Sequence, residues 1–266
     1  MKRKRAALVS LPLSLLAAVS VNAVEPTEVA EAVDALITDR PDFTESTQTI
    51  PRGRMQLEGG ATFTRRGSSR ETGIGELLLR VAAGKRSELR LGANSYVVQR
   101  APGSRTSGKD DVSLGLKVRL RDSETTSLLA PRVSLIVQTS VPSGARALRE
   151  DKWQPGAKLL FGWDVNEKTG FAANLNYDYA SEAGQRFGQV SASASVGYSV
   201  SERTGAFLET YALFPGSAGG ENETFVDTGL TYLLSPDFQL DARVGLGIGN
   251  NVGSDYFFGV GAARRF

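Results

Sequence analysis

The chain has 266 residues, of which 41% are apolar and 23% are charged, and its formal net charge is +2. It contains no cysteine and no histidine, which excludes disulfides, thiol nucleophiles, Fe–S clusters, Ser–His hydrolases and His-ligated zinc sites. We therefore expect no catalytic constellation, no metal site and no cofactor, and the 29 glycines are more than a helical enzyme usually carries.

Residues 1–23 have the features of a cleaved secretory signal peptide. Basic residues at 2–5 precede an apolar stretch at 6–19, and small residues allow cleavage after Ala23. A membrane anchor is the alternative, but the apolar stretch is shorter than the ~20 residues that span a bilayer. Cleavage would leave 27 basic and 29 acidic residues, so the basic excess gives no reason to expect a nucleic-acid partner.

Residues 24–53 differ from the rest of the chain. Apolar residues at helical spacing predict a short amphipathic helix over 25–37, and a charged, extended segment follows. Its motif consists of Asp39, Arg40, Pro41, Asp42 and Phe43. Because this segment has no apolar face, its backbone cannot lie among lipid tails. It is either a solvated periplasmic linker or a plug whose charges pair with lumen residues such as Arg80, Arg90 and Glu58.

Residues 54–266 are dominated by alternation of period two, which marks strands with one apolar and one polar face. From Val112 to Leu120, for example, every second residue is Val or Leu. The pattern predicts twelve strands, at approximately 54–65, 75–84, 88–99, 110–121, 128–140, 153–165, 170–180, 188–200, 204–214, 223–234, 238–249 and 255–266. We therefore expect an all-β fold, a single transmembrane antiparallel β-barrel, because outer-membrane barrels have an even number of strands of about ten residues.

Connection lengths and aromatic residues support the same fold. Short turns are expected at 85–87, 122–127, 166–168, 201–203 and 235–237, and long loops at 65–74, 100–109, 141–152 and 215–222, as in barrels with short periplasmic turns. Outward aromatic residues form an external belt (Phe63, Trp153, Tyr177, Tyr179, Phe214, Phe258) and a periplasmic belt (Trp163, Tyr198, Tyr232, Phe266). A soluble β-sandwich or lipocalin-like barrel also alternates, but its interior would have to hold every Leu and Val.

Two motifs carry a resemblance to a known family. Residues 37–46 (ITDRPDFTES) and the strand GRMQLEGG at 53–60 resemble the transporter-like outer-membrane family named after the MetA pathway of phenol degradation, and a weaker resemblance runs through 228–232 and 239–241 to the C-terminus. The resemblance implies an outer-membrane barrel with a transport role. The last strand ends in Phe266, which looks like the terminal signal that the barrel-assembly machinery recognises.

The polar face of the barrel is predicted to carry acids and bases in similar numbers. The candidate lumen-lining residues are Glu58, Glu76, Arg80, Arg90, Asp111, Lys117, Arg119, Lys158, Asp178, Glu209, Asp227, Asp241 and Arg243. Such charges must be hydrated or paired, so they form either a conduit or a paired network that supports the wall. We expect an outer-membrane channel or transporter for small solutes, with aromatic and other organic compounds as candidate cargo. A closed structural or interaction barrel is the alternative, and an enzyme is not expected.

Overall fold

The computed structural model describes residues 36–93, 96–123, 130–182, 185–216, 220–249 and 255–266. The predicted signal peptide and nearly all of the predicted helix lie outside these residues, and no helix within them is long and apolar enough to cross a bilayer. The described strands are β1 (Met55–Arg66), β2 (Ser69–Ala82), β3 (Ser87–Ala93), β4 (Tyr96–Ala101), β5 (Ser104–Lys109), β6 (Val112–Arg121), β7 (Arg132–Val141), β8 (Gln154–Asn166), β9 (Thr169–Glu182), β10 (Gln185–Ser199), β11 (Thr204–Pro215), β12 (Glu223–Ser235), β13 (Phe238–Ile248) and β14 (Tyr256–Arg265).

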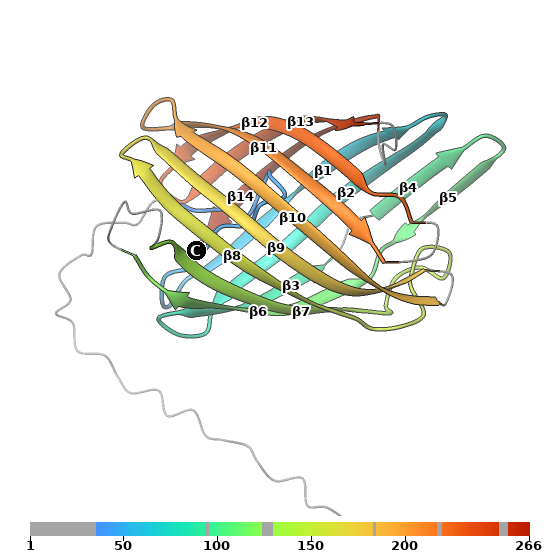
Figure 1. Ribbon diagram of the computed structural model, residues 1–266, viewed down its shortest axis with the longest axis horizontal. Coiled ribbons are helices and arrows are strands. Elements are labelled where there is room, and N and C mark those ends of the chain that lie inside the picture. Colours follow the sequence, from blue (N-terminus) through green and yellow to red (C-terminus); the bar gives the residue numbers. More distant parts are fainter. Residues whose placement is uncertain (1–35, 94–95, 124–129, 183–184, 217–219, 250–254) are drawn as a thin grey trace, which may run out of the picture. The chain divides into compact units, whose positions relative to one another are not determined.

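These strands form one antiparallel sheet that closes on itself (Figure 1). β1 pairs with β14 from Gln56↔Arg265 to Arg65↔Tyr256, which joins the two ends of the sheet. β3 and β4 both pair with β2 and share one strand position. β5 pairs with β4 and β6 pairs with β3, so these two also share one position. The result is a closed barrel of twelve strand positions, which confirms the predicted fold class.

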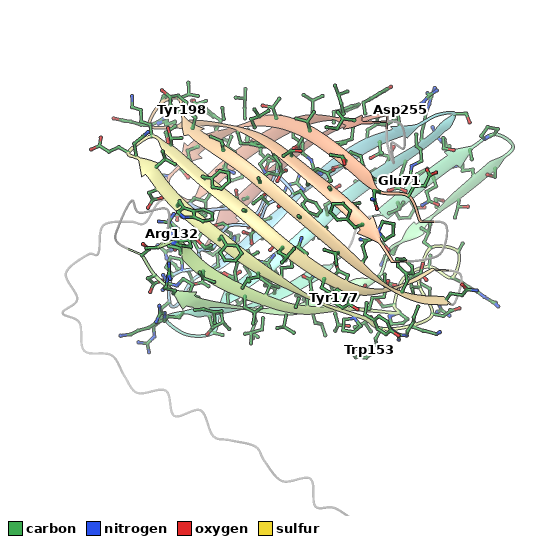
Figure 2. All side chains as sticks on the ribbon, in the orientation of Figure 1. Glu71, Arg132, Trp153, Tyr177, Tyr198 and Asp255 are labelled. Carbon is green, nitrogen blue, oxygen red and sulfur yellow. The ribbon has the colours of Figure 1, made fainter. Side chains whose placement is uncertain are left out.

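The barrel turns apolar side chains outward and charged side chains inward. On β6, Leu114 and Leu116 are 47% and 40% exposed, whereas Lys117 is fully buried. Figure 2 shows exposed aromatic residues at different levels of the outer face, with Tyr198 near one end and Trp153 nearer the other. An apolar surface that surrounds the whole barrel would be unfavourable in water and is typical of barrels that span a membrane.

The outward orientation of the leucines on β6 gives a prediction for assembly of the barrel in the membrane. Leu116→Arg should destabilise the folded barrel by roughly 2–4 kcal/mol, because an arginine on the lipid face is costly at the bilayer midplane. Leu120→Arg, on the same face near the end of β6, is the matched control and should cost about 0–1 kcal/mol. The measurement is the heat-modifiable shift of the folded barrel on gels. Equal damage from both substitutions would contradict the assigned membrane depth.

Two of the predicted long loops are wrong. Residues 65–74 and 100–109 are instead strand almost throughout, and two-residue turns join β1 to β2 and β4 to β5. Gly67 and Gly103 provide the positive φ angles (56° and 76°) that these turns require. The hairpin of β4 and β5 extends beyond its neighbours at the end opposite the C-terminus (Figure 1). Since this hairpin and the longest connection between consecutive strands, 142–153, lie at the same end, we assign that end to the cell exterior.

Candidate functional site

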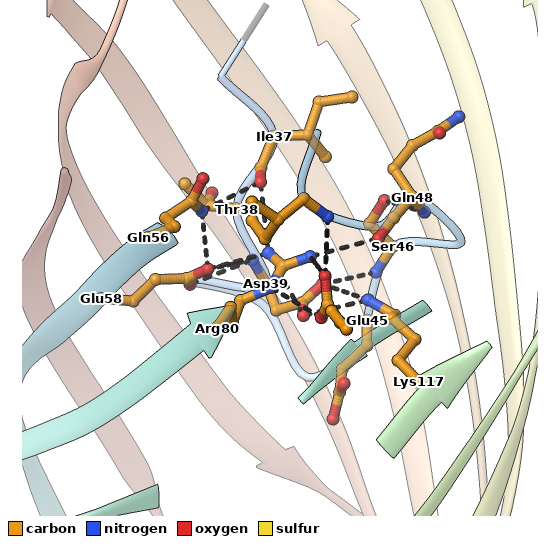
Figure 3. Close-up of polar contacts among 12 residues, drawn as sticks. Ile37, Thr38, Asp39, Glu45, Ser46, Gln48, Gln56, Glu58, Arg80 and Lys117 are labelled. Atoms are coloured by element: carbon orange, nitrogen blue, oxygen red, sulfur yellow. Dashed lines mark hydrogen bonds and ion pairs between the residues drawn. The ribbon is translucent and has the colours of Figure 1, made fainter. Parts of the chain in front are cut away.

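Residues 36–50, called the inner segment below, lie inside the barrel. Its side chains and backbone bond to inward-facing groups from strands all around the wall, including β1, β3, β7, β11 and β13. Within it, Thr44 is 3% exposed and Asp39 and Glu45 are each 8% exposed. Figure 3 shows the densest part of these contacts, around Asp39 and Arg80.

Arg80 of β2 is at the centre of the basic side of the interior. Its side chain is fully buried, and it forms ion pairs of 2.9 Å with both Glu58 and Glu88. It also donates to two backbone carbonyls of the inner segment, Ile37 O at 3.2 Å and Gln48 O at 3.1 Å. One guanidinium therefore connects the barrel wall to the inner segment near both of that segment's ends.

The other bases on this side bind the acids of the inner segment. Asp39 lies 2.5 Å from the Arg90 guanidinium and 3.1 Å from the Lys117 ammonium. Glu45 pairs with Arg90 at 2.8 Å and also with Lys158. Burial disfavours both carboxylates, but the surrounding bases outweigh it: the pKa of Asp39 is well below its usual range and that of Glu45 falls to about 2. Both acids are therefore charged when the segment is in place.

Arg40 points to the other side of the interior, where it pairs with Glu76 at 2.7 Å and with Asp241 at 3.5 Å. Glu76 has a φ of 42° and lies in a β-bulge opposite Glu58–Gly60, which directs its carboxylate toward Arg40. The guanidinium lies against Gly60 and Gly261, where any side chain would collide with it. Because neither glycine carries a side chain, these two positions leave room on the barrel wall for the Arg40 guanidinium.

Glu209 of β11 holds the middle of the inner segment. Its carboxylate accepts from the backbone N–H groups of Phe43 (2.7 Å) and Thr44 (2.6 Å). Phe43 stacks on Tyr211 with ring centres 4.4 Å apart, and Tyr211 stacks on Phe225 at 4.7 Å. Hydrogen bonds to the Glu209 carboxylate and a short aromatic stack therefore hold the same turn of the segment.

A cluster of three neighbouring acids lies beside this turn. Asp42 faces Glu209 and Asp227, and within the described residues none of the three forms an ion pair. Burial and then the Glu209 charge raise the pKa of Asp42 well above its usual range. The inner segment is therefore bound tightly by the basic side of the wall and less favourably by the acidic side once Asp42 ionises.

These two environments predict opposite pH effects on the docked segment. The lowered pKa of Glu45 means that its stabilising contribution is present above the ordinary pKa of a glutamate and is lost as the pH falls through about 2. The raised pKa of Asp42 means that stability is lost as the pH rises through its shifted value. Single-channel conductance should therefore be lowest between these limits. The rise in conductance at higher pH should disappear in Asp42→Asn and persist in Glu45→Gln; an unchanged rise at higher pH in Asp42→Asn would contradict the assignment.

Four other predicted lumen residues form no hydrogen bond or ion pair with the inner segment in the described part of the chain, although Arg119 lines a cavity together with Ile37 and Gln48. Asp111 accepts from the backbone N–H groups of Ser143 and Gly144 and so fixes an external loop. Arg119 donates to Lys85 O at a periplasmic turn. The guanidinium of Arg243 lies 5.2 Å above the ring of Phe257, and Asp178 on β9 lies opposite Gly156. Phe266 closes the seam, since its N–H donates to Met55 O at 2.8 Å.

The sequence reasoning missed the inward aromatic residues. Tyr211, Phe225 and Phe257 share the inward face with the acids of β11 and β12, so their position in the alternation could have revealed them.

Two grooves of about 380 and 460 Å³ lie between the inner segment and the wall of β8–β11, and Asp42 and Phe207 line both. In the described part of the chain no group of acids is arranged to hold a metal ion.

A closed barrel with an apolar outer face and a charged interior defines this protein as a transmembrane β-barrel of the outer-membrane type. More particularly, the chain belongs to the family described as "Putative MetA-pathway of phenol degradation", whose model matches residues 38–266. The match therefore includes most of the inner segment as well as the barrel.

Solved structures show the same fold. The chain is similar to an outer-membrane channel from Pseudomonas putida F1, with a TM-score of 0.64 and 15% identity over 83% of this chain and 98% of that one. It is also similar to NanC porin (TM-score 0.55, 14% identity, 79% and 98% covered). KdgM porin gives a TM-score of 0.52 and 9% identity, with 80% and 99% covered. No match was found among curated proteins.

Proposed function

We propose that this protein is an outer-membrane channel for small solutes and that the inner segment is its removable plug. The observation that carries the proposal is the kind of contact that holds the segment. It adds no strand to the sheet, and ion pairs and hydrogen bonds to a polar wall hold it in place. Water can replace such contacts once the segment leaves, whereas a wall lined with apolar side chains would remain collapsed.

Small organic compounds, aromatic compounds among them, are the proposed cargo. The grooves beside the inner segment combine polar side chains with Phe207, and the aromatic stack of Phe43, Tyr211 and Phe225 reaches from the segment toward the exterior. The channel and porins of similar fold support transport, and the phenol degradation that the family description names supports aromatic cargo. Recognition of Phe266 by the barrel-assembly machinery stays a prediction.

A barrel that remains closed is the second candidate. It is favoured by the filled interior, in which Arg80, Lys117, Glu58 and Glu209 are all almost completely buried. In this case the inner segment would be a permanent part of the wall rather than a plug.

Planar bilayers and liposome swelling distinguish the two candidates. We expect the purified full-length protein to show brief, voltage-dependent openings, and its liposomes to swell faster in small organic solutes than protein-free liposomes. A correctly folded, heat-modifiable barrel that stays silent in bilayers and admits no solute would contradict the channel and support the closed barrel.

A further inference from the structure

Four arginines form a ladder across the external end of the barrel. Arg65 of β1 lies directly opposite Arg70 of β2, Arg70 lies opposite Arg100 of β4, and Arg100 lies opposite Arg105 of β5. Directly opposed residues of antiparallel strands point to the same face, so the four side chains stand side by side. At ~4.8 Å between strands the ladder is roughly 14 Å long.

The ladder lies on the outer face, just beyond the lipid-facing surface. Phe63, Ile74 and Val98 occupy the same face of β1, β2 and β4, and Ile74 is 53% exposed. Arg65 and Arg100 follow Phe63 and Val98 by two residues, a rise of roughly 7 Å toward the exterior. This is the level at which lipid headgroups meet the acyl chains.

The ladder has no acidic partner among the residues that the structure describes. Like charges directly opposite each other destabilise a sheet, yet within the described residues none of the four arginines forms an ion pair. Arg65 donates to Gly67 O, and the nearby carboxylate of Asp255 accepts from the Gly67 N–H instead. Lys109, opposite Tyr96 on the same face, adds a fifth positive charge.

A groove of about 230 Å³ connects this charge to the apolar surface. It is lined by Phe63, Thr72, Ile74 and Val98 toward the membrane and by Arg70 and Arg100 toward the exterior. The groove therefore presents apolar surface and arginine donors to one ligand. Arginine is the side chain best suited to bind phosphate through paired hydrogen bonds.

We propose that the arginine ladder binds the phosphorylated headgroup of an outer-leaflet glycolipid of the lipopolysaccharide class, with one acyl chain in the groove below it. The phosphates neutralise cations that oppose one another across β1, β2, β4 and β5. This site is separate from the interior and does not depend on whether the barrel conducts.

The test measures lipid A binding to the folded full-length protein in detergent by native mass spectrometry. Bis-phosphorylated lipid A should bind more tightly than monophosphorylated lipid A, and neither phosphatidylethanolamine nor inorganic phosphate should compete. The ladder variant Arg70→Gln/Arg100→Gln/Arg105→Gln should bind lipid A at least about tenfold more weakly, since each lost arginine removes charge-assisted hydrogen bonds.

The matched control Lys85→Gln/Lys168→Gln/Arg203→Gln removes three exposed cations from turns at the opposite end and should bind lipid A like the natural protein. The proposal would be overturned if the ladder variant bound lipid A as tightly as the natural protein, or if the control variant lost as much affinity as the ladder variant. The single variant Arg100→Gln provides the same comparison with less risk to folding, and it should bind measurably more weakly than Arg203→Gln alone. Displacement of lipid A by inorganic phosphate would show an anion site without lipid specificity and would also overturn it.

Discussion

Deletion of residues 36–50 should change a mostly closed barrel into a steadily open pore. The deletion removes the chain that fills the interior and leaves Arg80, Arg90 and Lys117 free to be hydrated together with Glu58 and Glu88. Twelve strands enclose more space than an eight-stranded barrel, whose side chains suffice to fill it. The expected result is a large rise in single-channel conductance in planar bilayers, with the heat-modifiable shift retained.

A second variant distinguishes the effect of filling the pore from the effect of the ion pairs that hold the inner segment. Asp39→Asn/Glu45→Gln keeps the length of the inner segment but removes its pairing with Arg90, Lys117 and Lys158. Its conductance should lie between those of the natural protein and the deletion variant, since the segment is held less firmly but still occupies the pore. If the folded deletion variant conducts no better than the natural protein, the inner segment is not a plug.

Arg80→Gln should release the inner segment without removing it. The substitution leaves the carboxylates of Asp39, Glu58 and Glu88 close together without the guanidinium that they share. Removal of one partner from a buried ionic network costs about 3–5 kcal/mol. We expect frequent channel openings and rapid proteolysis of the inner segment in detergent-solubilised protein.

Two controls test the Arg80 interpretation. Arg132→Gln also removes an arginine from an ion pair, but its partner Asp164 is 63% exposed, so the loss should be no more than about 1 kcal/mol. The double variant Arg80→Gln/Glu88→Gln removes one acid together with the base and should recover part of the closed state. Equal channel opening in Arg132→Gln and Arg80→Gln would show that the effect is not specific to the buried network.

The fold could be predicted from the sequence wherever a strand crosses lipid. Leu114, Leu116 and Lys117 are placed correctly because lipid on one side and a polar lumen on the other impose strict alternation. The strand residues 69–74 and 104–109 were assigned to loops because polar residues or glycine occupy almost every position on both of their faces, so their sequence shows no alternation of period two. The turns at Gly67 and Gly103 were missed for the same reason.

The interior site was predictable in part. The inward charges Arg80, Arg90 and Glu58 follow from the alternation, but their partners do not. Glu76 reaches Arg40 only because a bulge turns it inward, and Phe43 meets Tyr211 only because of the path of the inner segment. Strand periodicity contains no information about either.

Arg40 also has a consequence for how the barrel is completed. It lies against Gly60 of β1 and Gly261 of β14, pairs with Glu76 of β2 and Asp241 of β13, and donates to Val260 O of β14. The arginine thus joins the first and last parts of the ring from inside. Because the inner segment directly precedes β1, this contact lies where the first and last strands of the ring meet. A pore that opens by releasing this segment therefore also gives up a contact across its own seam.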